Sequence, residues 1–238
     1  MWITRFWCFV ERKTIAELWA SPDQSEWLRA LSDYYKNRRV LMIRELEETI
    51  KNLTPDGVQA MGEHEWYEFL RDVFFPWKFR GNYLPQKVRL LRKHENKDGL
   101  AYLMSTKERL FNCDLTKYSG RAKALETARG INGLGQAGAS CLLAVIFPAS
   151  VGGADKMVVR ALHEIPGLPE RPKLPAIKRD SQGNDNANLT DAGVLMLVEI
   201  MRRKAAELNA LFHTSSWTPR MIDMILWDHG TKICSDPC

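Results

Sequence analysis

The spacing of hydrophobic residues predicts helices along most of the chain. Apolar side chains recur three and four positions apart over residues 25–36, 40–50 and 63–75, which is the period of an amphipathic helix. Shorter helices are predicted over residues 85–94, 99–104, 106–111 and 119–128. The sequence contains no sustained alternation of apolar and polar residues of the kind that strands show. The pattern therefore predicts a mainly α fold.

Two further helices are predicted near the C-terminus. Thr190 is expected to cap a long helix with an apolar stripe over residues 194–211. Thr218 and Pro219 are typical of a helix start, and Gly230 is typical of a helix end. Residues 166–188, rich in proline and polar side chains, predict a surface connection between these helices and the preceding ones.

Residues 74–87 mix aromatic rings with cations, and three helix-disrupting residues (Pro76, Gly81 and Pro85) predict a loop. Rings and cations together suit an unstacked base and its phosphates. The candidates for a base pocket or a DNA contact are Phe75, Trp77, Lys78, Phe79, Arg80, Tyr83 and Gln86. The alternative is that the rings anchor the segment to the core. The basic residues between 36 and 44 are most simply a solvated face.

Composition is that of an ordinary globular protein. The 238 residues are 45% hydrophobic and 26% charged, and the net charge of +5 permits a polyanionic partner without requiring one. Five scattered cysteines argue against a disulfide framework and for a reducing compartment. We found no signal-peptide pattern or membrane-spanning run. The expectation is an intracellular, cytoplasmic protein.

The stretch 129–162 contains a glycine turn, an apolar helix and an aspartate that opens another helix. Gly133 and Gly135 allow a sharp turn with exposed amides, and the helix that begins at Gln136 adds unpaired amides of its own. Such a turn can bind a phosphate oxygen without a cationic side chain. Asp155 precedes Lys-Met-Val-Val and is a good helix N-cap. A capping role and a catalytic role are compatible.

Over residues 123–162 this arrangement resembles the helix-hairpin-helix superfamily of DNA glycosylases. The resemblance makes INGLG the hairpin, QAGASCLLAVIF the helix after it, and VGGADKMVVRAL the corner that delivers the catalytic aspartate, Asp155. It implies that the hairpin binds the DNA backbone through Asn132, Gly133, Leu134, Gly135, Gln136 and Ala137. It also implies a two-lobed fold with the active cleft between the lobes.

Position 137 departs from the family in a way that selects a mechanism. Bifunctional members carry a lysine there, and this chain has Ala137. Without that amine no Schiff base forms at this position, so the resemblance implies a monofunctional enzyme in which Asp155 stabilises an oxocarbenium-like sugar. Cysteines at the spacing of an iron–sulfur cluster are missing, so no cluster and no metal site are expected. The sequence leaves open whether a monovalent cation binds at the hairpin.

The function predicted from the sequence is excision of a modified or damaged base from double-stranded DNA, in repair or in defence against modified foreign DNA. A nucleoid-associated monomer is expected. The predicted lobes are residues 60–150, with the hairpin at about 121–147, and residues 1–59 with 151–238, connected by residues 166–188. The alternatives are a non-catalytic helix-hairpin-helix DNA-binding protein and a helical scaffold with a coincidental glycine turn.

Overall fold

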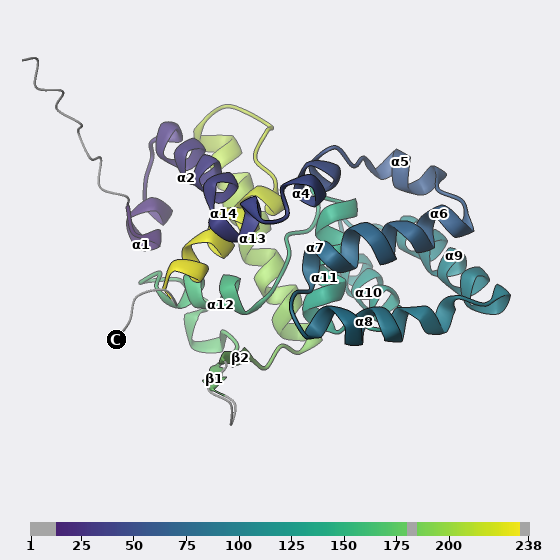
Figure 1. The fold of residues 1–238 in the computed structure, drawn as a ribbon. Helices are drawn as coiled ribbons and strands as arrows, with labels where there is room; N and C mark the ends of the chain where they lie inside the picture. The colour runs from purple at the N-terminus through teal and green to yellow at the C-terminus, as the bar shows by residue number, and fades with distance from the viewer. Residues whose placement is uncertain (1–12, 180–184, 234–238) are drawn as a thin grey trace, which may run out of the picture.

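The computed structural model describes residues 13–179 and 185–233 and confirms a mainly α-helical fold (Figure 1). The N-terminal half contains α1 (Ile15–Trp19), α2 (Gln24–Lys36), α3 (Arg38–Leu41), α4 (Arg44–Lys51), α5 (Pro55–Ala60), α6 (Glu63–Glu68), the π-helix η1 (Phe69–Phe74), α7 (Phe75–Lys78), α8 (Tyr83–Leu91), η2 (Arg92–His94) and α9 (Lys97–Phe111). The C-terminal half contains α10 (Tyr118–Arg129), α11 (Gln136–Ile146), α12 (Lys156–His163), η3 (Arg171–Lys173), α13 (Asp191–Leu211) and α14 (Pro219–Lys232).

The described chain packs around two large hydrophobic cores, and both α9 and α11 contribute residues to each. The first core unites α1, α2 and α10 with α12, α13 and α14, and the second unites α5, α6, η1 and α7 with the start of α9. Helix α11 lies between them (Figure 1). It buries Ala139 and Leu143 in the first core and Leu142 and Ile146 in the second. An apolar helix buried on all sides in this way explains its uniformly hydrophobic sequence.

The predicted helix over residues 40–50 is broken at its beginning. Helix α3 ends at Leu41, and α4 starts at Arg44 after Ile43, whose φ of −128° and ψ of 31° are not helical. Val40 packs with Tyr34 in a small third cluster, whereas Ile50 belongs to the second core. One straight helix could not place Val40 in the third cluster and Ile50 in the second core, so the chain turns between these two residues.

The predicted loop over residues 74–87 is largely helical. Helix α7 continues to Lys78 because Pro76 lies in its first turn, where proline's missing N–H is not needed. Pro85 is likewise in the first turn of α8. The non-helical link is short, and Gly81 in it has a left-handed φ of 54°. Phe75, Trp77 and Tyr83 therefore project from helices, whereas Phe79 lies directly after α7 in extended conformation.

Other boundaries also differ from the sequence prediction. The two helices expected over 99–104 and 106–111 are one, α9. Gly230 lies inside α14 instead of ending it, because a Cβ there would be 2.0 Å from the Met157 carbonyl oxygen of α12. The connection over 166–188 includes an unpredicted antiparallel pair, β1 (Ile177–Arg179) with β2 (Asp185–Ala187). Strands this short give no readable alternation. The predicted caps Thr190 and Thr218 are confirmed.

Candidate active site

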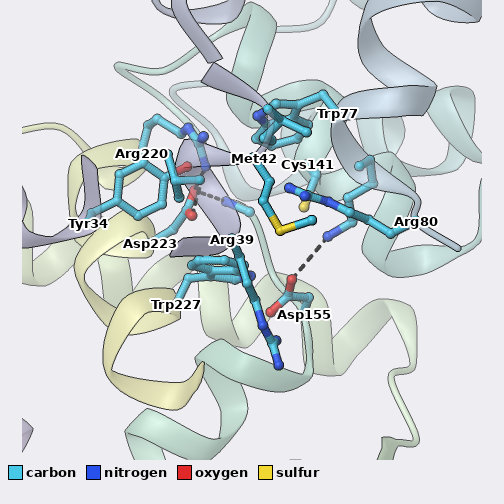
Figure 2. Close-up of a pocket in the computed structure, with 14 residues that line it drawn as sticks. Tyr34, Arg39, Met42, Trp77, Arg80, Cys141, Asp155, Arg220, Asp223 and Trp227 are labelled. Atoms are coloured by element: carbon cyan, nitrogen blue, oxygen red, sulfur yellow. Dashed lines mark hydrogen bonds and ion pairs between the residues drawn. The ribbon is translucent and has the colours of Figure 1, made fainter. Parts of the chain in front are cut away.

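A pocket of about 360 Å³ gathers residues from five separated parts of the chain (Figure 2). It lies where α3, the end of α7, the segment before α12 and the start of α14 meet. Its walls carry aromatic rings, four cations and two carboxylates. The lining residues are Tyr34, Arg39, Val40, Met42, Ile43, Trp77, Lys78, Arg80, Cys141, Gly153, Asp155, Arg220, Asp223 and Trp227.

Asp155 is both a helix cap and a pocket residue. One carboxylate oxygen, Oδ1, accepts hydrogen bonds from the backbone amides of Met157 (2.9 Å) and Val158 (3.3 Å) and so caps α12. The other oxygen, Oδ2, accepts a hydrogen bond from Lys78 Nζ at 3.0 Å. The two side chains are 15% and 14% exposed. The carboxylate therefore has one oxygen fixed by the backbone and one engaged in the pocket.

The Lys78–Asp155 pair is held in its charged form. Burial alone would raise the pKa of Asp155, but the charge and hydrogen bond of Lys78 together with the two helix amides outweigh it, and the pKa falls below its ordinary value of 3.8. Burial alone would lower the pKa of Lys78, but Asp155 and the Cys141 sulfur raise it above its ordinary value of 10.5. Burial raises the pKa of Cys141, and the charge and hydrogen bond of Lys78 oppose this shift.

Helix α11 fixes the segment that carries Asp155. Ser140 Oγ accepts a hydrogen bond from the Ala154 amide at 3.0 Å. A Cβ on Gly153 would lie 2.9 Å from Cys141 Sγ, so only glycine lets this segment approach α11 closely. Because α11 also carries the glycine turn at its N-terminus, the turn and Asp155 belong to one rigid unit.

A buried ion pair forms one wall of the pocket. Arg220 Nη1 donates to Asp223 Oδ1 (2.8 Å) and Oδ2 (2.9 Å), and the Gly153 amide donates to Oδ2 at 2.6 Å. The Arg220 guanidinium also lies over the Trp77 ring, 5.1 Å from its centroid. Both charged side chains are almost fully buried. Their hydrogen bonds offset part of the desolvation cost of burying two charges.

Glu47 anchors two of the aromatic rings. Its carboxylate accepts hydrogen bonds from Trp77 Nε1 (2.6 Å) and Tyr34 Oη (3.1 Å), and Arg220 Nη2 lies 3.9 Å away. Each ring is thereby fixed in orientation by a polar contact at its edge. The pocket is pre-formed, as binding sites for small groups generally are.

The glycine turn has the conformation that the sequence predicted. Gly133 has a φ of 98°, and Gly135 is the N-cap of α11. The turn is braced by His94, whose Nε2 accepts a hydrogen bond from the Asn132 amide at 3.1 Å. In the part of the chain that the structure describes, the amides of Gly135, Gln136 and Ala137 have no acceptor. These donors suit an anion.

The structure places the sequence candidates in three groups. Trp77, Lys78 and Arg80 line the pocket. Phe75 is fully buried and Phe79 packs on it, with ring centroids 5.3 Å apart. Tyr83 and Gln86 are exposed on α8. Leu134 is buried in the second core, and the rest of the hairpin set lies at the turn or in the first turn of α11.

Several lining residues were not identified from the sequence. Arg39 belongs to the basic cluster that was interpreted as a solvated face, and α3 brings it to the pocket. The sequence could have indicated Arg220 and Asp223. Opposite charges three residues apart on the apolar face of α14 must pair if they are to be buried. Tyr34 and Trp227 look like ordinary core rings in the sequence.

Within the described ranges, no group of three or more His, Cys, Asp or Glu side chains gathers to hold a metal ion, and no helix is long and apolar enough to cross a membrane. Cys8, Cys234, Cys238 and the N-terminal aromatic residues Trp2, Phe6 and Trp7 lie outside those ranges. No protein-family model matches this chain, and no curated protein or solved structure shows significant similarity to it.

Proposed function

We propose that this chain is a helix-hairpin-helix DNA N-glycosylase that removes a modified or damaged base from double-stranded DNA. The position of Asp155 is the observation that carries the proposal. Capping α12 uses only Oδ1, yet Oδ2 faces a lysine inside a pocket lined by aromatic rings. A cap alone requires neither the pocket nor the lysine. Perturbed carboxylates in such clefts are typical of catalytic sites.

In the proposed reaction the target nucleotide leaves the duplex and its base enters the pocket. The C1′–N bond breaks, its electron pair leaves with the base, and the base nitrogen takes a proton from solvent. Asp155, kept ionised by Lys78, stabilises the oxocarbenium-like sugar. Water then adds to C1′, and the proton that it loses passes through Asp155 to solvent. Excision leaves an abasic site in an intact strand.

The proposed enzyme is monofunctional, because position 137 holds alanine where bifunctional relatives of this type carry a lysine. It requires no cofactor, although a monovalent cation at the hairpin would be compatible with the turn. The setting is repair or defence against modified foreign DNA, since both need the same chemistry. We propose an intracellular, nucleoid-associated monomer.

The proposed lobes are residues 60–150 and residues 1–59 with 151–238, with the active cleft between them. The pocket supports this division, because its lining is drawn from both ranges. Trp77 and Cys141 come from the first, and Tyr34, Asp155 and Arg220 come from the second. A base would thus be enclosed by both lobes.

Asp155→Asn tests the proposal. The asparagine oxygen can still cap α12, but the charge is lost. A unit charge about 4 Å from the sugar contributes about 4 kcal/mol at an effective dielectric constant of ~20. Since each 1.36 kcal/mol is about tenfold in rate, excision should fall about a thousandfold. Duplexes carrying a panel of modified bases are incubated with the protein, and abasic sites are counted after alkali.

Asp23→Asn is the matched control, because Asp23 caps α2 through its side chain and does not line the pocket. It should excise like the native chain. Full activity of Asp155→Asn would contradict a catalytic role for Asp155. Strand nicking by the native chain without alkali would contradict the proposal that the enzyme is monofunctional. Duplex binding without release of any base would support the alternative, a non-catalytic helix-hairpin-helix DNA-binding protein.

A further inference from the structure

The pocket has more positive charge than its own acids neutralise. Of its four cations, Lys78 pairs with Asp155 and Arg220 pairs with Asp223. Within residues 13–179 and 185–233, Arg39 and Arg80 have no carboxylate partner. Figure 2 shows both arginines at the pocket, reaching it from different elements. Two unpaired guanidiniums at one pocket constitute a site for an anion.

The two arginines line the same pocket, and each carries a positive charge. Burial lowers the pKa of Arg80, the nearby Tyr34 and Glu47 raise it, and the charge of Arg39 lowers it further. An arginine does not lose its proton under these conditions, so the repulsion persists until an anion binds between the two groups. An incoming anion would relieve it and would gain charge-assisted hydrogen bonds from both.

The backbone of Arg39 is held in position before any ligand arrives. Asn37 Oδ1 accepts a hydrogen bond from the Arg39 amide at 2.9 Å, while Asn37 Nδ2 donates to Asp228 Oδ1 of α14 at 2.7 Å. Arg80 lies in the short link after α7, where the neighbouring Gly81 is left-handed and open, with nothing near its Cβ position. The backbone of Arg39 is thus fixed to α14, whereas Arg80 lies on a turn whose neighbouring Gly81 is open to solvent.

We propose that Arg39 and Arg80 together bind one backbone phosphate of the everted nucleotide. This rests on the proposed function, which places the sugar against Asp155. A base filling the ring-lined part of the pocket leaves the sugar's own phosphates at the rim, where Arg39 is exposed. Planar guanidinium groups match phosphate oxygens well. The clamp is distinct from the glycine turn, which offers amides to a different phosphate.

The test measures binding of the full chain to a duplex with a tetrahydrofuran abasic analogue, which needs no knowledge of the base. The duplexes differ in one linkage, 5′ or 3′ to the analogue, replaced by a neutral methylphosphonate. We expect the neutral replacement at one of these two positions to weaken binding of the native chain on the order of tenfold, as loss of a charge-assisted contact does. Arg39→Gln and Arg80→Gln should lose a similar factor on the charged duplex and nothing more on the neutral one.

Arg171→Gln, an exposed arginine of η3 outside the pocket lining, removes the same charge and should retain the native dependence on the linkage. Equal affinity of the native chain for all the duplexes would overturn the clamp, and so would variants that stay sensitive to the neutral linkage. The clamp would also be overturned if the variants lost only the excision of bases that carry an anionic substituent. Base release that depends on Asp155 is measured separately, so the clamp can fail while the proposed function stands.

Discussion

Alanine substitutions at the two glycines of the turn should have opposite effects on folding and on DNA binding, because the surroundings of Gly133 and Gly135 differ. At Gly133 an alanine must adopt a φ of 98°, and its Cβ would meet the Lys87 carbonyl oxygen and Phe75 Cε1, each at 3.0 Å. Left-handed backbone costs an L-residue about 1–2 kcal/mol before any contact is relieved. We expect Gly133→Ala to cost about 2 kcal/mol in the free energy of unfolding, which is roughly 4–8 °C in Tm for a chain of this size.

At Gly135 the backbone is extended, with a φ of −95°, and a Cβ would meet nothing within 4 Å. Folding therefore has no steric need for glycine there, and Gly135→Ala should cost only about 0.5 kcal/mol, the lower preference of alanine for an N-cap position, well below the cost of Gly133→Ala. A phosphate bound to the turn's amides would meet the new methyl group. Loss of one phosphate contact should weaken duplex binding about tenfold. The slope of log K against log salt should stay unchanged, because no cationic side chain is removed.

The assays are thermal unfolding and duplex binding over a salt series, with each variant measured in both. Gly133→Ala tests the contribution of the turn to stability, and Gly135→Ala tests its contribution to DNA binding. The two variants therefore separate the two roles of the turn. Native duplex affinity of Gly135→Ala would refute phosphate binding by the turn. A Tm for Gly135→Ala as low as that of Gly133→Ala would refute the geometric reasoning itself.

Three other predictions concern the Lys78–Asp155 ion pair. Lys78→Arg keeps the charge that holds Asp155 ionised, so excision should stay within about tenfold of the native rate; loss of excision in Lys78→Arg would contradict this role. Because the pKa of Asp155 lies below 3.8 and the pKa of Lys78 above 10.5, excision should be independent of pH between these values. The pair's contribution to stability should likewise disappear only as pH falls through the lowered pKa of Asp155 or rises through the raised pKa of Lys78. A titration of the rate near neutral pH would contradict this assignment.

Local signals in the sequence predicted the helices and their starts well. Thr190 and Thr218 cap the helices they were expected to cap, and Asp155 caps α12. The errors arose where a residue's role depends on a distant segment. Gly230 was expected to end a helix, but α12 packs so closely against it that α14 needs glycine in its interior. Pro76 was expected to break a helix, but a first-turn position tolerates it.

The candidate site was predictable only where its residues are close in sequence. The turn and Asp155 lie in one continuous stretch, so their relation could be inferred from spacing. Arg39 and Asp223 reach the pocket through the packing of α3 and α14, and no sequence pattern connects either residue to Asp155. Arg39 is the clearest case, because an exposed arginine in a basic cluster looks the same whether or not a pocket opens beside it.

The number of buried charges around the pocket argues that it serves a ligand. Glu47, Arg220 and Asp223 are nearly fully buried, and Lys78 and Asp155 are mostly so. Buried ion pairs contribute little net stability, and apolar residues of the same shape often fold as well or better. A wall built only for packing would therefore not need them. The proposed function would need them, because it requires a wall that orients Asp155 and keeps the aromatic rings in fixed positions.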